Sequence, residues 1–235
     1  MRYVRSFAPT LALALALTLG PLAATGHADR PTSGDMSLLS GRTLGNGETL
    51  LAAALGYPSF WAELMLAPSS TFNFGFRGSV AIASPVMGFG TGVGGSFSVP
   101  IRLHLLGAGT LDIAAFFEPQ VFAGEGALSG QMEESPFANN FGFGVGGLVG
   151  AVAGAQVADA VTLILGLGGD VVYVSTEGVG GELVGTGIAF LGIEALMSRD
   201  TMLFVEARGG IGFKPELLFE GPEVVRISLG LAYLL

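Results

Sequence analysis

The most constraining feature of this chain is that apolar residues recur at every second position over long stretches. Phe72, Phe74 and Phe76 alternate with small or polar residues. From Val225 to Leu235, every odd position is apolar. A period of two residues indicates β-strands with two different faces, whereas an amphipathic helix would repeat its apolar positions every 3.6 residues.

The same alternation runs through most of the chain and predicts ten strands. They span about residues 48–57, 60–67, 71–83, 96–106, 111–123, 141–156, 160–174, 183–197, 202–213 and 223–235. Most are longer than the roughly five or six residues typical of strands in soluble proteins, whereas about 9 to 11 tilted residues cross a bilayer. The strand lengths therefore favour a sheet that spans a membrane.

The connections between these strands alternate between short and long. The short ones lie near 67–70, 107–110, 157–160 and 198–201, and the longer ones near 84–95, 124–140, 175–182 and 214–222. Transmembrane barrels have short turns on one side and long loops on the other, and closure pairs every backbone group inside lipid. The sequence therefore predicts an all-β fold, a transmembrane antiparallel up-and-down β-barrel of about ten strands, with eight or twelve as alternatives. The first and last strands are expected to close it.

Two other folds compete with this prediction. Gly146, Gly150 and Gly154 have the spacing found where transmembrane helices pack in pairs, so residues 141–169 could form a glycine-rich helix pair. A soluble β-sandwich or lipocalin-like barrel would also alternate, but it needs a polar outer face. Only 12% of the residues are charged, against roughly 25% in soluble domains, which leaves too few for such a face.

The N-terminal residues have the features of a cleavable secretory signal peptide. Arg2 and Arg5 precede an apolar stretch that ends at Pro21 and is too short to span a bilayer. The predicted organisation is a signal peptide over 1–28, a flexible periplasmic N-terminal segment over 29–47 and the barrel over 48–235. Whether the segment 29–47 is a free tail or a plug inserted in the barrel stays open.

Composition excludes several kinds of site. The chain has no cysteine, which removes thiol catalysis and disulfides, and its net charge of -9 argues against binding a nucleic-acid backbone. Residues 90–95 and 142–147 match G-x-G-x-x-G, but 39 glycines in 235 residues make that match easy, and neither stretch lies in a βαβ unit. We expect no cofactor, no metal and no nucleic-acid partner.

Along the predicted strands, the charged residues alternate with the apolar ones and therefore lie on the opposite face, which places them in the lumen of the barrel. A charged side chain on the lipid face costs roughly 2 to 4 kcal/mol near the midplane, and charges inside a narrow lumen must pair. We predict a polar lumen network of Glu63, Arg77, Arg102, His104, Asp112, Glu118, Glu194, Glu206, Arg208 and Arg226. Within this network, His104 is expected to face Asp112 across a hairpin, and Trp61 to cover Arg77.

The signal peptide, the alternating strands and the final Ile227 to Leu235 segment resemble those of small Gram-negative outer-membrane β-barrel proteins. In that family the last strand is read by the barrel-assembly machinery and usually ends in an aromatic residue, where this chain has Leu235 and keeps Tyr233. The resemblance implies export to the bacterial outer membrane, contact with its lipid and assembly by that machinery. Proteases of the omptin type share the architecture, but they need paired acids and a histidine at the outer rim. His104 falls near the other end, so we expect no enzyme.

Two roles remain open at this stage. The first is a non-enzymatic structural or surface-interaction protein with a side-chain-plugged lumen and with the loops 84–95 and 124–140 as its contact surface. The alternative is a small porin-like channel or transporter for small polar or amphipathic solutes, with an opening between the sixth and seventh strands. Small residues would leave that opening at Gly144, Gly146, Gly150, Gly154, Gly166 and Gly168.

Overall fold

The computed structural model describes residues 36–57, 59–81, 93–125, 141–176, 180–213 and 223–235. Its strands are β1 (Thr49–Tyr57), β2 (Ser59–Ser69), β3 (Phe72–Ala81), β4 (Gly94–Ser98), β5 (Ile101–Ala108), β6 (Leu111–Glu125), β7 (Phe141–Ala158), β8 (Val161–Thr176), β9 (Gly180–Leu196), β10 (Thr201–Phe213) and β11 (Glu223–Leu234). No helix in these ranges is long and apolar enough to cross a bilayer.

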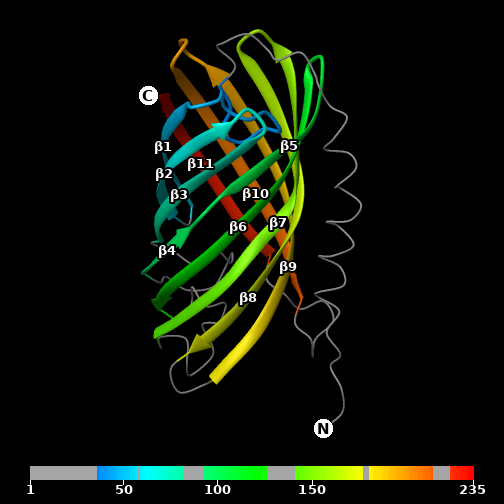
Figure 1. Cartoon of the computed structure of the whole chain (residues 1–235). Helices are drawn as coiled ribbons and strands as arrows, with labels where there is room; N and C mark the ends of the chain where they lie inside the picture. Colours follow the sequence, from blue (N-terminus) through cyan, green and yellow to red (C-terminus); the bar gives the residue numbers. More distant parts are fainter. Residues whose placement is uncertain (1–35, 58, 82–92, 126–140, 177–179, 214–222) are drawn as a thin grey trace.

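Hydrogen bonding closes these strands into one antiparallel barrel (Figure 1). Neighbouring strands pair along the chain, and β1 pairs with β11, with Leu50 opposite Leu234 and Tyr57 opposite Ile227. The predicted closure by the first and last strands is confirmed. Residues 141–169 lie in the β7 and β8 strands, which pair with each other, so the alternative of a glycine-rich helix pair is wrong.

The strand predicted over 96–106 is two strands, β4 and β5, which lie end to end and fill one position in the barrel. Both pair with β3 on one side and with β6 on the other. The break falls at Pro100, which has no N–H to donate to the ladder. Its carbonyl still accepts a hydrogen bond from the Gly75 N–H at 2.8 Å, so the barrel remains closed there with ten strand positions.

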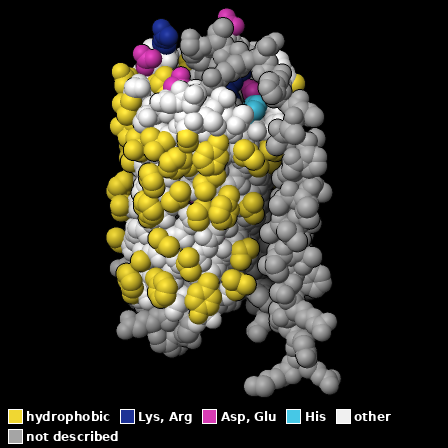
Figure 2. Space-filling view, viewed as in Figure 1, with side chains coloured by type: hydrophobic (Ala, Val, Ile, Leu, Met, Phe, Trp, Pro, Cys, Tyr) yellow, Lys and Arg dark blue, Asp and Glu magenta, His cyan; other side chains and the backbone are white. Residues whose placement is uncertain are grey.

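The outer face of the barrel is apolar and the strand charges point inward. Leu55 and Leu167 are 75% and 66% exposed, whereas Glu63 is 1% exposed. Figure 2 shows apolar side chains spread over the barrel wall and the charged ones gathered at one end. A soluble barrel would have the opposite pattern, so that alternative is wrong and the exterior suits lipid.

The two ends of the barrel differ. At one end, here called the tight-turn end, short turns join β2 to β3, β5 to β6, β7 to β8 and β9 to β10, and the chain ends there after β11 (Figure 1). The turn between β5 and β6 includes Gly109 at φ 62°, a conformation that side chains rarely adopt. The strand ends next to the predicted long loops lie at the opposite end, here called the long-loop end, and the loops themselves fall largely outside the described residues.

The segment before β1 enters the barrel at the tight-turn end. Leu38 and Leu44 are fully buried, and Ser40 is 1% exposed. The expectation of a flexible segment over 29–47 therefore does not hold for residues 36–44, while residues 29–35 lie outside the described ranges. We call Met36–Leu44 the plug.

Candidate functional site

One carboxylate on β9 binds the first half of the plug to the barrel wall. Glu194 accepts hydrogen bonds from the Leu38 N–H at 2.7 Å, the Leu39 N–H at 2.6 Å and the Ser37 hydroxyl at 2.8 Å. The Ser37 hydroxyl also accepts a hydrogen bond from the Ser40 N–H at 3.1 Å, which closes a tight turn. Hydrogen bonds to a charged acceptor are the stronger kind, so this buried carboxylate fixes the backbone of the plug.

Contacts from the opposite wall hold the second half of the plug. Arg102 on β5 donates to the Ser40 carbonyl at 3.2 Å, and His104 Nδ1 lies 3.0 Å from the Gly41 carbonyl oxygen. Arg42 forms an ion pair with Asp112 on β6 at 3.1 Å. A Cβ atom at Gly41 would lie 2.3 Å from the Asp112 carbonyl oxygen, so only glycine lets the plug approach the wall this closely.

Beneath these polar contacts the plug packs into an apolar core. Leu38 and Leu44 meet inward side chains of β1, β2 and β10, which contribute Leu50, Met65 and Phe204, each with no exposed surface. Fully burying one such side chain is worth about 1.5 to 3 kcal/mol. The tight-turn end of the barrel is therefore filled like the interior of a globular domain.

A second closure lies above the plug, toward the middle of the barrel. Arg77 bonds Glu63 at 2.6 Å and Glu118 at 3.0 Å, and the Ser98 hydroxyl donates to Glu118 at 2.6 Å. The Arg77 guanidinium also lies 4.7 Å from the centre of the Trp61 ring, which confirms that Trp61 covers it. Three strands are thus connected across the lumen by one arginine.

A second ion pair faces this cluster from β10. Arg208 is paired with Glu206, and its guanidinium lies 5.0 Å from the centre of the Phe190 ring on β9. Together, Glu63, Arg77, Glu118, Glu206 and Arg208 form what we call the charged layer. Within the described residues, its two arginines are each in contact with a carboxylate and an aromatic ring.

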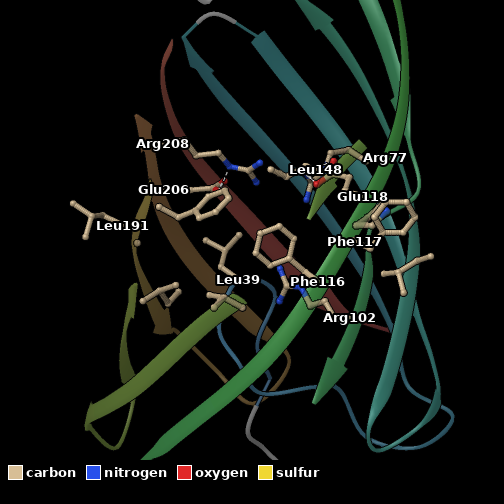
Figure 3. A pocket seen from close by; sticks show the side chains of 16 residues that line it. Leu39, Arg77, Arg102, Phe116, Phe117, Glu118, Leu148, Leu191, Glu206 and Arg208 are labelled. Atoms are coloured by element: carbon tan, nitrogen blue, oxygen red, sulfur yellow. Dashed lines mark hydrogen bonds and ion pairs between the residues drawn. The ribbon is translucent and has the colours of Figure 1, made fainter. Parts of the chain in front are cut away.

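Two cavities flank the charged layer. The one on the long-loop side is polar and is lined by Ser79, Ser96, Gln120 and Arg226 among others. The one on the plug side, here called the chamber, has largely apolar walls and is partly open to solvent (Figure 3). Arg77, Glu118, Glu206 and Arg208 line both cavities, so the charged layer is the wall between them.

The residues expected in the lumen network separate into three places. Glu63, Arg77, Glu118, Glu206 and Arg208 lie in the charged layer, and Arg102, His104, Asp112 and Glu194 hold the plug instead. Arg226 lines the polar cavity.

His104 and Asp112 are not direct cross-strand partners as expected, although both side chains lie close to Gly107. The register shifts between His104 and Leu106, which places His104 opposite Ala114 and Asp112 opposite Gly107. Among the described contacts, neither side chain bonds the other, because each binds the plug.

The glycines of β7 and β8 leave no opening between the sixth and seventh strand positions. A Cβ at Gly150 would lie 2.6 Å from the Phe116 ring, one at Gly166 2.9 Å from Phe190, and one at Gly154 2.4 Å from the Cβ of Ser40. The small residues therefore make room for lumen side chains and for the plug, and the expected opening is filled.

The sequence left open whether the segment before β1 is a free tail or an inserted plug, and the structure shows the plug for residues 36–44. One available signal was that strands β1 and β2 carry apolar residues on both faces, since Leu50 and Met65 point inward. Inward apolar residues are not expected in a lumen lined by polar groups, but they are expected where an apolar segment packs inside the barrel. Met36, Leu38, Leu39 and Leu44 were the nearest apolar residues without a strand to occupy.

No group of three or more His, Cys, Asp or Glu side chains is placed to hold a metal ion in the part of the chain that the structure describes.

Comparison with known proteins gives likeness only among solved structures, because no family model and no curated sequence matches the chain. The translocator domain of autotransporter NalP from Neisseria meningitidis matches with 11% identity and a TM-score of 0.40, over 98% of this chain and 99% of that one. The outer membrane protease OmpT from Escherichia coli matches with 9% identity and a TM-score of 0.39, over 81% and 94%.

A bacterial polysaccharide outer membrane secretin also matches, with 11% identity and a TM-score of 0.38 over 77% of this chain, which spans only 57% of that protein. Likeness at this level says nothing about what the chain binds or does. Closed strand pairing and an apolar exterior give the chain the architecture of a small outer-membrane β-barrel, with a lumen that its own N-terminal segment occupies.

Proposed function

We propose that this protein is a non-enzymatic, non-conducting β-barrel of the bacterial outer membrane with a structural or surface-interaction role. The observation that carries the proposal is the plug, whose Leu38 is fully buried and whose backbone is bonded to Glu194. An open channel has a continuous water-filled path, and here that path would have to cross both the plug and the charged layer.

The orientation follows from the general rule that short turns of such barrels face the periplasm and long loops face outward. The plug then closes the periplasmic end, and any contact with other molecules falls to the loops 84–95 and 124–140, largely outside the described residues. The outer-membrane lipid and the barrel-assembly machinery are the proposed partners. The apolar residues at alternate, outward-facing positions of β11 support assembly by that machinery.

The chemistry of the lumen supports a role without catalysis. His104 is the only histidine after the proposed signal peptide, and its Nδ1 is engaged with the Gly41 carbonyl at the plugged end. A general base needs free access to its substrate within hydrogen-bond reach.

Conductance across a planar bilayer tests the proposal. Protein lacking residues 1–28 would be refolded, shown to be folded by a heat-modifiable gel band, and shown to insert by flotation with vesicles. Inserted wild-type protein is expected to give no current steps above the lipid background. Stable steps of uniform size would contradict the proposal and favour a small channel for polar or amphipathic solutes.

A further inference from the structure

The chamber between the plug and the charged layer interrupts the polar lining of the lumen. Its walls include six apolar side chains from the plug and from β6 to β9, namely Leu39, Phe116, Leu148, Val152, Ile164 and Phe190. The rings of Phe116 and Phe190 meet edge to face at 5.3 Å. These side chains point away from lipid and nevertheless line a cavity inside the barrel that is partly open to solvent.

One buried arginine at the plug end of this chamber has donors to spare. Arg102 is 8% exposed and lines the chamber, and Figure 3 shows it on the far side of Phe116 from the charged layer. Its one hydrogen bond among the described residues is from Nη1 to the Ser40 carbonyl. A guanidinium carries five N–H donors, so the others find no partner in the part of the chain that the structure describes.

The other arginines of the chamber are different in this respect. Arg77 bonds Glu63 and Glu118, and Arg208 bonds Glu206. No described carboxylate lies within ion-pair distance of Arg102. Glu63 and Glu194 attract this guanidinium only from beyond ion-pair distance, so an anionic oxygen placed directly against its remaining N–H donors would form the stronger, charge-assisted hydrogen bonds.

We propose that the chamber is a binding site for a small amphipathic anion, a molecule with one carboxylate and an apolar hydrocarbon body. The carboxylate accepts hydrogen bonds from Arg102, and the hydrocarbon lies against Phe116, Phe190 and Ile164. The opposite polarity is disfavoured, because the arginines at the far end of the chamber, Arg77 and Arg208, are already paired with Glu118 and Glu206. This site goes beyond the proposed function and does not depend on whether the lumen conducts.

Binding of decanoate, with its carboxyl carbon labelled with ¹³C, to the refolded barrel in lipid nanodiscs tests the site by NMR. Empty nanodiscs and the uncharged analogue decanol report partition into lipid. The wild-type barrel is expected to show saturable binding of decanoate at one site, with a shifted carboxylate resonance, and no saturable binding of decanol or acetate.

Two variants separate the charge from the apolar cavity. Arg102→Gln is expected to weaken binding by about tenfold or more, since a charge-assisted hydrogen bond is lost, and Ile164→Phe to abolish it by filling the chamber. Arg199→Gln, which removes a charge from the exposed turn between β9 and β10, is the matched control and keeps wild-type affinity. Each variant is first checked for a heat-modifiable band, and Arg102→Met, which also removes the charge, replaces Arg102→Gln if the latter does not fold.

Several results would overturn the proposal. Uptake that does not saturate, or that matches empty nanodiscs, would mean that decanoate enters lipid only and that water serves Arg102. Equal affinity for decanol, or no loss of affinity in both chamber variants, would mean that the site is not the chamber.

Discussion

Arg77 illustrates how a narrow barrel accommodates charge. Its side chain is 10% exposed, and it bonds Glu63 and Glu118 while covering the face of Trp61. A charged side chain is stable inside the lumen only if it has partners of this kind, because they must offset the free-energy cost of removing each ion from water. The same condition explains why the described strand charges gather on the inward parity.

Arg77→Met is therefore expected to destabilise the barrel by about 3 to 5 kcal/mol, because it leaves the carboxylates of Glu63 and Glu118 buried without their partner. The measurement is urea unfolding of the refolded protein in vesicles. The double variant Glu63→Gln with Arg77→Met should recover part of the loss. The exposed control Arg199→Gln should change little, and a loss in Arg77→Met no larger than in that control would contradict the account.

Among the elements, the strands could be predicted from sequence, whereas the plug was only one of two alternatives for the N-terminal segment. Alternation of apolar and polar residues is a local property, so the strands could be recognised from the sequence. The exception is the break between β4 and β5 at Pro100, which lacks the N–H that a continuous strand would donate. The plug depends on contacts distant in the chain, since Leu38 and Glu194 lie 156 residues apart. The same holds for the candidate site, of which only the local features could be predicted. The inward parity of Arg102, Asp112 and Glu194 followed from alternation, but their binding to the plug did not.

Glu194→Gln should loosen the plug, because a neutral amide replaces the carboxylate that accepts three hydrogen bonds from Ser37, Leu38 and Leu39. Trypsin offers a direct readout, since Arg42 lies in the plug, is largely buried and is paired with Asp112. We expect slow cleavage after Arg42 in the wild-type barrel and faster cleavage in Glu194→Gln, measured by mass spectrometry of the released N-terminal fragment. Equal rates for both proteins would show that Glu194 does not retain the plug.

For the whole molecule, an apolar exterior suited to lipid surrounds an interior that is largely filled by the chain itself. The outward residues of β8, such as Leu165 and Leu167, are more than half exposed and would contact solvent in a soluble protein. Inside, the plug, the chamber and the charged layer follow one another along the axis. The apolar exterior is suited to contact with lipid, whereas the interior is packed with side chains of the protein itself.

A charge placed at the centre of the outer face tests the membrane position of the barrel. Leu167→Arg is expected to cost roughly 2 to 4 kcal/mol of unfolding free energy in phospholipid vesicles, as for an arginine near the bilayer midplane. Ser198→Arg, in the exposed turn between β9 and β10, is the matched control and should cost little. A penalty at residue 167 equal to that at 198 would mean that β8 does not face lipid there.

The central claim is that residues 36–44 occupy the lumen, and the absence of cysteine from the chain allows this to be measured with single-cysteine variants. Ser40→Cys and Ser198→Cys would be treated with a water-soluble maleimide after refolding into vesicles. Residue 40 is 1% exposed, so it should react at least about tenfold more slowly than residue 198, as expected for a site that reacts only when the structure opens locally.

Adding Gly154→Val should remove this protection, because the new side chain takes the space of Ser40. Gly78→Val, where a Cβ meets nothing within 4 Å, should leave it unchanged. Slow labelling at residue 40 that only Gly154→Val accelerates is the result the account predicts. Labelling at residue 40 as fast as at residue 198 in the otherwise native barrel would contradict it.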